Sequence, residues 1–131
     1  MIKAIIFDVS GVLHPFDKDL LAILRELKGK YRLAILSSLS GETLRHFLKE
    51  NDIEDYFDEV ISAYDLGHGK HEPTIYKLVA ERLGIQPNEA IFIDDEAYRV
   101  DGAEAAGMQG IVYRGVAALK EALAQHVDIN A

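Results

Sequence analysis

Three apolar segments of this chain each end in polar residues whose types could do chemistry. These residues are Asp8 and Ser10 after the first segment, Ser37 and Ser38 after the second, and Asp94 and Asp95 after the third. Carboxylates that lie close together repel one another, and a hard divalent cation such as Mg²⁺ relieves that repulsion. Serine hydroxyls at a helix N-terminus suit phosphate oxygens. Together, these residue types indicate metal-assisted chemistry on a phosphate group, if the fold brings the clusters together.

Each of these residues also has an ordinary structural interpretation. A lone Asp after a strand most often caps a helix or forms a turn, and Ser37 and Ser38 would serve equally well as caps of the following helix. Lys70 lies in the glycine-containing stretch 67–70, and on general grounds it would be an exposed loop lysine. Clustering at one edge of a sheet is the feature that would favour chemistry over capping.

The elements between the clusters decide whether they meet. Apolar runs predict strands at residues 3–7, 33–36, 59–61, 90–93 and 110–113. Helical spacing predicts helices at about 19–27 (capped by Asp17 or Asp19), 41–50, 73–83, 97–106 and 115–126, before a frayed tail at 128–131. This alternation is typical of βαβ units around a parallel sheet. The carboxyl ends of such strands line one crevice, which the three clusters would share.

Composition narrows the class of protein. A chain of 131 residues without repeats or linkers predicts a single domain over 1–131. The absence of cysteine excludes thiolate catalysis and suits a reducing, cytoplasmic setting. The first apolar run ends at Asp8, too early for a signal peptide or a membrane span. A net charge of −8 disfavours general attraction to nucleic acid or to an anionic membrane.

In their order and spacing, these segments resemble the haloacid dehalogenase-like superfamily, which phosphatases dominate. The matching stretches are residues 6–13 for its first motif, 36–38 for the second, 70–76 for the third, and 91–95 with 103–108 for the fourth. The resemblance implies an α/β fold, a Rossmann-like three-layer sandwich with a five-stranded parallel sheet in the order 5-4-1-2-3.

The resemblance also implies a nucleophile and a metal site. Asp8 would attack phosphorus to form an aspartyl-phosphate, which water then hydrolyses. Mg²⁺ would be held by the carboxylate of Asp8, the backbone carbonyl of Ser10 and the carboxylate of Asp95, with Asp94 behind them.

Four further residues would then bind the phosphate group: Ser37, Ser38, Lys70 and Gly11. Ser37 would hydrogen-bond a phosphate oxygen. Lys70 would pair with both Asp8 and the phosphate, which keeps the nucleophile ionised and stabilises developing charge. The resemblance therefore counts Ser37 and Lys70 with Asp8 as catalytic.

Position 10 departs from the family pattern. Family phosphatases carry an Asp there that protonates the leaving group and later activates water, a contribution of roughly a hundredfold to ten-thousandfold. Because a serine hydroxyl is too weak an acid and base, we expect slow turnover of alkyl phosphates and less impaired turnover of acyl or aryl phosphates. Arg99 stands where an Asn is common, a change expected to alter specificity more than chemistry.

The chain leaves no room for a cap domain between the first two motifs, since one short loop and one predicted helix separate Gly11 from Ser37. An open site suits a macromolecular phosphorylated substrate, or a homo-oligomer in which a neighbouring subunit acts as the lid. Two other functions stay open at this point. A site that binds Mg²⁺ and phosphate without turnover would make a regulatory or scaffold module, and a haloacid dehalogenase would need no acid at position 10.

Overall fold

Five short strands lie side by side in the computed structural model, which describes residues 1–129. They are β1 (Ala4–Phe7), β2 (Arg32–Ser37), β3 (Glu59–Ser62), β4 (Ala90–Asp94) and β5 (Gln109–Val112). All neighbouring pairs are parallel, in the order β3-β2-β1-β4-β5. The predicted sheet and its strand order are confirmed, and β1 is the central strand.

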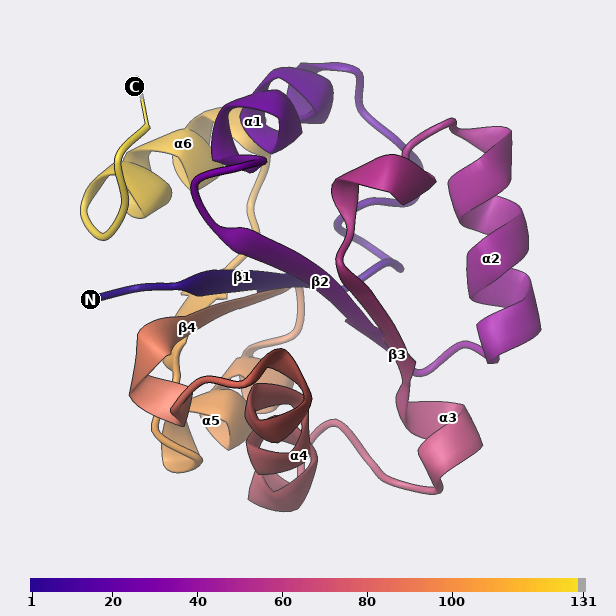
Figure 1. Cartoon of the computed structure of the whole chain (residues 1–131), viewed down its shortest axis with the longest axis vertical. Coiled ribbons are helices and arrows are strands. Elements are labelled where there is room, and N and C mark those ends of the chain that lie inside the picture. The colour runs from indigo at the N-terminus through magenta and orange to yellow at the C-terminus, as the bar shows by residue number, and fades with distance from the viewer. Residues whose placement is uncertain (130–131) are drawn as a thin grey trace.

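Helices cover both faces of this sheet (Figure 1). One face packs against α1 (Asp19–Leu27), α2 (Gly41–Glu50) and α6 (Val116–Ala124), and the other against α4 (Pro73–Leu83) and α5 (Ala97–Ala105). Successive strand side chains point to opposite faces. In β1, Ile5 and Phe7 therefore join the first core, while Ala4 and Ile6 join the second. The predicted three-layer α/β sandwich is confirmed.

Several local details differ from the sequence-based expectations. A short helix, α3 (Ala63–Leu66), and 3-10 turns at Glu54–Tyr56 and Pro87–Glu89 were not predicted, and β5 begins and ends one residue earlier than expected. Ser37 and Ser38 do not cap α2, because Ser40 occupies the N-cap and its hydroxyl accepts from the Thr43 amide. The predicted frayed tail falls partly on residues 130–131, which lie outside the described residues.

The connections leave the carboxyl edge of the sheet open. Between β1 and β2 the only regular helix is α1, and between β3 and β4 there are α3, α4 and one 3-10 turn. Neither connection contains an inserted cap domain, as the sequence predicts. None of the helices in residues 1–129 combines the length and apolarity that a bilayer crossing requires.

Candidate active site

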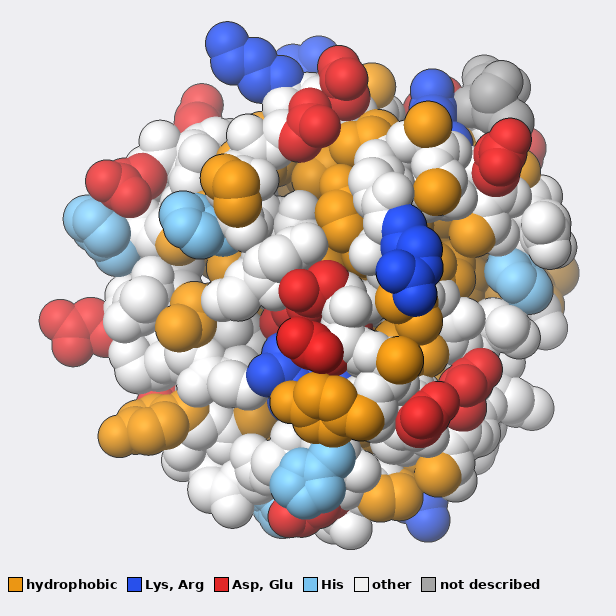
Figure 2. Space-filling model, turned by 180° about the vertical axis from the view of Figure 1, so that it is seen from behind, with side chains coloured by type: hydrophobic (Ala, Val, Ile, Leu, Met, Phe, Trp, Pro, Cys, Tyr) orange, Lys and Arg blue, Asp and Glu red, His pale blue; other side chains and the backbone are white. Residues whose placement is uncertain are grey.

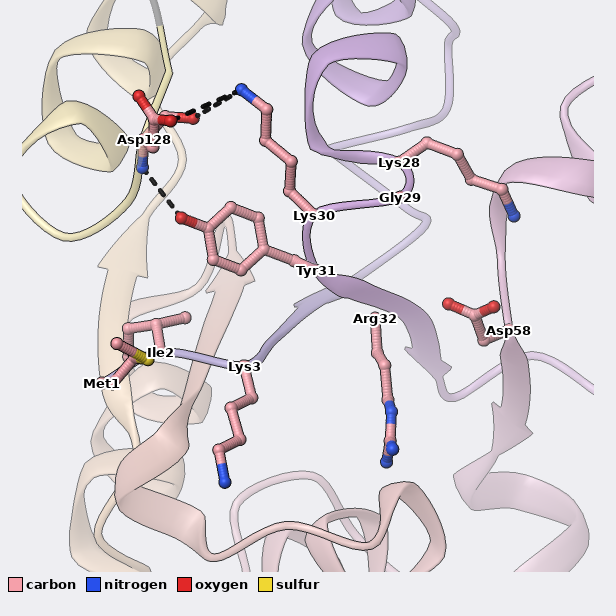
Figure 3. A pocket seen from close by; sticks show the side chains of 10 residues that line it. All are labelled: Met1, Ile2, Lys3, Lys28, Gly29, Lys30, Tyr31, Arg32, Asp58 and Asp128. Atoms are coloured by element: carbon pink, nitrogen blue, oxygen red, sulfur yellow. Dashed lines mark hydrogen bonds and ion pairs between the residues drawn. The ribbon is translucent and has the colours of Figure 1, made fainter.

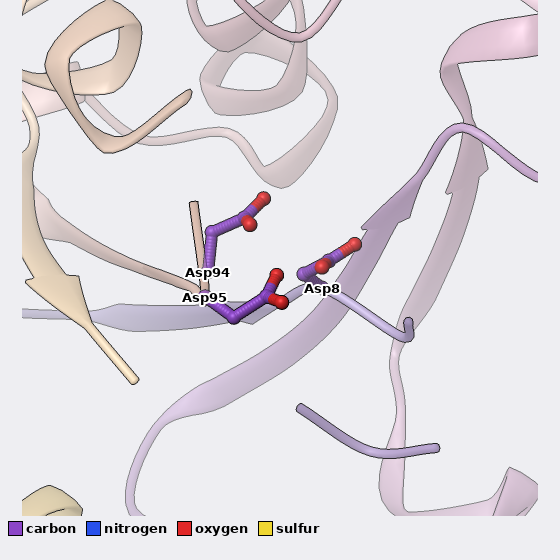
Figure 4. Close-up of side chains that lie close together, drawn as sticks. All are labelled: Asp8, Asp94 and Asp95. Atoms are coloured by element: carbon purple, nitrogen blue, oxygen red, sulfur yellow. The ribbon is translucent and has the colours of Figure 1, made fainter. Parts of the chain in front are cut away.

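Three carboxylates meet where β1 and β4 end. Phe7 pairs with Ile93 in the parallel ladder, and the Asp8 amide donates to the Ile93 carbonyl at 2.9 Å. This register brings Asp8 beside Asp94, and one oxygen from each of Asp8, Asp94 and Asp95 lies within 4.8 Å of the others. Figure 4 shows the three side chains leaving adjacent strand ends, with the Asp95 carboxylate facing Asp8.

Lys70 lies at the centre of this cluster. Its Nζ atom is 2.5 Å from Oδ1 of Asp8 and 2.8 Å from Oδ2 of Asp94. Both Asp8 and Lys70 are buried, at 1% and 3% exposure. The general expectation of an exposed loop lysine is therefore wrong for Lys70, because two buried carboxylates compensate the cost of desolvating its charge.

Tyr76 holds the backbone that carries Lys70. Its buried hydroxyl lies within hydrogen-bonding reach of the Lys70 carbonyl and also, at 3.0 Å, of the Arg99 carbonyl. Burial, followed by the negative charge of Asp94, raises the pKa of this phenol, which therefore stays protonated and remains a donor. Tyr76 belongs to the third motif, but its sequence position alone predicted no role for it.

Two oxygens of the cluster lack a hydrogen-bond partner among the described residues: Oδ2 of Asp8 and Oδ2 of Asp94. The Asp94 oxygen is still at ion-pair distance, 2.8 Å, from the ammonium nitrogen of Lys70. The other Asp94 oxygen, Oδ1, accepts from the Glu96 amide at 3.0 Å. Buried oxygens of this kind are costly unless something binds them. A hard cation that prefers oxygen ligands, such as Mg²⁺, fits this donor set.

The environment changes the acidity of the carboxyls. Burial raises the pKa of Asp8 to about 6, against the lowering effect of Lys70 and with a smaller raising effect from Asp94. Partial burial also raises the pKa of Asp95, with further contributions from its hydrogen bond and charge interaction with Asp94. Because these carboxyls interact, added positive charge would favour their ionised forms.

Arg99 is a second cation at the cluster. Its Nη1 atom lies 3.7 Å from Oδ1 of Asp94 and 4.0 Å from Oδ2 of Asp8. Its Nε donates to the hydroxyl of Tyr98 at 3.1 Å. Arg99 was predicted to influence specificity, and in the structure it lies at ion-pair distance from two of the candidate site residues.

Ser10 and Gly11 lie on the turn that follows β1. The Ser10 side chain is exposed, and Gly11 donates from its amide to the His14 carbonyl at 3.0 Å. Gly11 has φ +87°, and a Cβ there would lie 2.1 Å from Oδ2 of Asp95. Gly11 was predicted to bind substrate. The structure shows that it lies against the Asp95 carboxylate.

Ser37 and Ser38 lie at the end of β2, the strand next to β1. The Ser37 side chain is buried, and its hydroxyl accepts from the Leu39 amide at 3.1 Å. Ser38 is exposed. Within the described residues, no hydrogen bond joins either serine to the carboxylates or to Lys70. Both flank the cluster, and a direct role in phosphate binding stays a prediction.

A separate hollow of about 680 Å³ lies at the amino ends of the strands, the opposite edge of the sheet (Figure 3). Its cationic side chains already have partners. Lys3 forms an ion pair with Glu89, and Lys30 forms one with Asp128. Lys28 donates to the backbone carbonyl of Asp55, and Arg32 donates to the backbone carbonyl of Leu83. Figure 2 shows the molecule from behind, with acidic side chains beside basic ones near the middle of the face in view. We take the carboxylate cluster as the candidate active site.

The fold is a Rossmann-like α/β domain with a carboxylate cluster at the carboxyl ends of its central strands. A family model described as haloacid dehalogenase-like hydrolase matches residues 14–107, and the chain belongs to that family. The matched segment contains Lys70, Asp94 and Asp95 but begins after Asp8 and Ser10. The assignment of the first motif therefore rests on the order of the motifs and on the geometry at the end of β1.

Individual relatives differ in their chemistry. The chain is 35% identical to (S)-2-haloacid dehalogenase 4A of Burkholderia cepacia over 71% of this chain and 41% of that protein. It is 32% identical to the phosphorylated carbohydrates phosphatase of Thermotoga maritima over 63% of this chain and 38% of that protein. The chain thus spans less than half the length of either relative.

Among solved structures, the chain is similar to a HAD family enzyme of Bacteroides thetaiotaomicron in complex with magnesium and inorganic phosphate. The two are 28% identical, with a TM-score of 0.67, over 76% of this chain and 53% of the other.

Proposed function

We propose that this chain is a Mg²⁺-dependent phosphohydrolase whose nucleophile is Asp8. The observation that carries the proposal is the state of the Asp8 carboxylate. One oxygen is held by buried Lys70 at 2.5 Å, while the other, Oδ2, has no hydrogen-bond partner among the described residues. A carboxylate that is restrained through one oxygen, and whose other, buried oxygen makes no hydrogen bond, supports the assignment of Asp8 as the nucleophile. The magnesium and phosphate bound to the Bacteroides thetaiotaomicron enzyme support the choice of cofactor and substrate class.

In the proposed reaction, a carboxylate oxygen of Asp8 attacks phosphorus. The bond from phosphorus to the leaving oxygen breaks, and its electron pair departs with that oxygen. Water then attacks the aspartyl-phosphate, which releases inorganic phosphate and restores the carboxylate. Lys70 compensates charge beside the nucleophile, and Ser37 and Ser38 are proposed to bind phosphate oxygens together with Gly11.

Bound Mg²⁺ would neutralise charge on the transferring phosphoryl group. We assign its ligands to the carboxylates of Asp8 and Asp95 and the backbone carbonyl of Ser10, with Asp94 adjacent. Asp8 is mostly ionised above a pH of about 6, its pKa in this environment, so the nucleophile is available near neutrality.

Ser10 limits which substrates this site turns over quickly. No carboxyl group stands at position 10 to protonate the leaving group, and the Ser10 hydroxyl is a poor substitute. We therefore propose acyl or aryl phosphates as better substrates than alkyl phosphates. Because neither connection carries a cap, the open edge also admits a macromolecular phosphorylated substrate, or a neighbouring subunit as the lid.

The test is turnover of an aryl phosphate and of a chloroacid, each with Mg²⁺ and with EDTA. We expect phosphate release only with Mg²⁺, and none from the Asp8→Asn variant. Halide release that survives EDTA would instead establish a dehalogenase, the chemistry named for the Burkholderia cepacia relative. A structure soaked with Mg²⁺ and beryllium trifluoride provides the second readout. No turnover and no adduct on Asp8 would leave a phosphate-binding regulatory or scaffold module.

A further inference from the structure

Two cations bracket the same pair of buried carboxylates. Lys70 lies beside Oδ1 of Asp8 and Oδ2 of Asp94. Arg99 lies beside the opposite oxygen of each, Oδ2 of Asp8 and Oδ1 of Asp94, at 4.0 and 3.7 Å. The Arg99 distances are too long for hydrogen bonds, so its guanidinium interacts with the carboxylates through charge alone.

The backbone of Arg99 is held while its head group keeps unused donors. The Arg99 carbonyl accepts from Tyr76, and Nε donates to the hydroxyl of Tyr98. Within the described residues, the other guanidinium nitrogens make no hydrogen bond, and the side chain is 23% exposed. A planar guanidinium with free donors matches the oxygens of a phosphate group. Arg99 therefore faces the free oxygen of the nucleophile with donors available for a ligand.

The charges of the cluster make metal and phosphate binding interdependent. The three carboxylates carry one negative charge more than Lys70 and Arg99 offset. A divalent metal alone would reverse the sign of the site, and a phosphate dianion would restore it. Arg99 repels the metal in the absence of phosphate, and phosphate gives the guanidinium an alternative partner.

We propose that Arg99 couples the two ligands: it weakens Mg²⁺ binding to the free protein and makes bound phosphate strengthen it. This inference rests on the proposed function, since it concerns the same metal and the same phosphoryl group. Thermodynamic linkage requires that Mg²⁺ strengthen phosphate binding by the same factor. Mg²⁺ would then bind tightly beside the nucleophile only when a phosphorylated substrate is also bound.

Calorimetric titration of Mg²⁺, with and without inorganic phosphate, tests this without any measurement of turnover. Without phosphate, Arg99→Gln should bind Mg²⁺ on the order of tenfold more tightly than the wild type, because it removes a positive charge beside two of the carboxylates proposed to surround the metal. Phosphate should then strengthen Mg²⁺ binding less than in the wild type. Arg99→Lys should keep the weak Mg²⁺ affinity, because it retains the charge, but lose part of the coupling.

Lys49→Gln is the matched control. It makes the same change in net charge at an exposed position in the last turn of α2, which runs from the carboxyl edge of the sheet back towards the opposite edge. It should alter neither affinity. If the wild type and Arg99→Gln bind Mg²⁺ equally, or if phosphate strengthens Mg²⁺ binding equally in both, the inference is overturned. Either result would leave the proposed metal site standing. If neither protein binds Mg²⁺, the inference and the proposed function both fail.

Discussion

The ammonium nitrogen of Lys70 lies 2.5 Å from Oδ1 of Asp8, and both side chains are buried in the middle of the sheet edge. The contact joins residues 62 positions apart in the chain, so it exists only in the folded protein. A buried ion pair contributes little net stability when intact, but removal of one partner leaves an uncompensated charge. Substitutions at these two residues should therefore report on the electrostatics of the site as well as on its chemistry.

Lys70→Met should destabilise the protein by about 3 kcal/mol near pH 8, because it leaves two carboxylates buried beside each other. The loss should be smaller near pH 5, where Asp8 takes up a proton. Urea denaturation in EDTA at both pH values measures the difference. Lys77→Met, on an exposed position of α4, is the control and should show neither effect. A loss for Lys70→Met that is equal at both pH values would contradict the buried contact.

In the absence of metal, the titration of the Asp8 carboxyl group should lower the free energy of unfolding as the pH rises from about 4 to about 6. The folded protein holds the Asp8 proton up to a pH of about 6, whereas the unfolded chain releases it near the ordinary pKa of 3.8. Between these values the folded state binds more protons, so the free energy of unfolding decreases by up to about 3 kcal/mol.

Asp8→Asn should remove that part of the pH dependence, and Mg²⁺ should reduce it in the wild type by favouring the ionised carboxylate. Urea unfolding at closely spaced pH values, in EDTA and in Mg²⁺, provides the measurement. The raised pKa of Asp95 contributes in the same direction, so a residual slope is expected in the variant. Identical slopes in wild type and Asp8→Asn would show that Asp8 titrates normally.

Ser10→Asp should raise turnover of alkyl phosphates by roughly a hundredfold, because it introduces the missing acid, and should change turnover of aryl phosphates little. The Ser10→Asn variant separates proton transfer from side-chain size, because Asn is similar in size to Asp but cannot donate a proton as an acid. Steady-state kinetics on one substrate of each type decides the matter. An equal gain from Asn and Asp would mean that size, not acidity, limits the wild type.

Gly102→Ala should destabilise the protein by about 1 to 3 kcal/mol. In a helix interior this substitution normally stabilises by about 1 kcal/mol, so the sign of the change is itself informative. The reason for the reversal is that an added Cβ in α5 would lie 2.8 Å from the backbone oxygen of His71. Chemical denaturation measures the effect, and a gain in stability would show that the two backbones separate easily.

Much of the fold was predictable from local pattern. Strands buried on both faces of a parallel sheet must be continuously apolar, which is why β1, β2 and β4 stand out in the sequence. The edge strand β5 was placed one residue late because Gln109 is polar and exposed. The meeting of Asp8 with Asp94 followed from the rule that ligands bind at the carboxyl ends of parallel strands.

The remaining features depend on tertiary contacts that no local pattern encodes. Lysines are usually exposed, so the burial of Lys70 follows only from where both carboxylates point. The N-cap of α2 fell on Ser40 because the segment 37–40 contains three serine hydroxyls, and the bend after β2 selects one of them. Tyr76 reaches the carbonyls of Lys70 and Arg99 across two elements, a link that its position in α4 alone does not predict.

The missing side chain at Gly102 also has a mechanical consequence. It allows the backbone of α5 to lie directly against the backbone at Lys70 and His71, and Tyr76 ties the same two segments together. The two cations of the site thus lie on segments that are held against each other on one side of the crevice. We expect any opening motion that admits a bulky substrate to occur in the other half, where the turn of residues 9–14 carries Ser10 and Gly11.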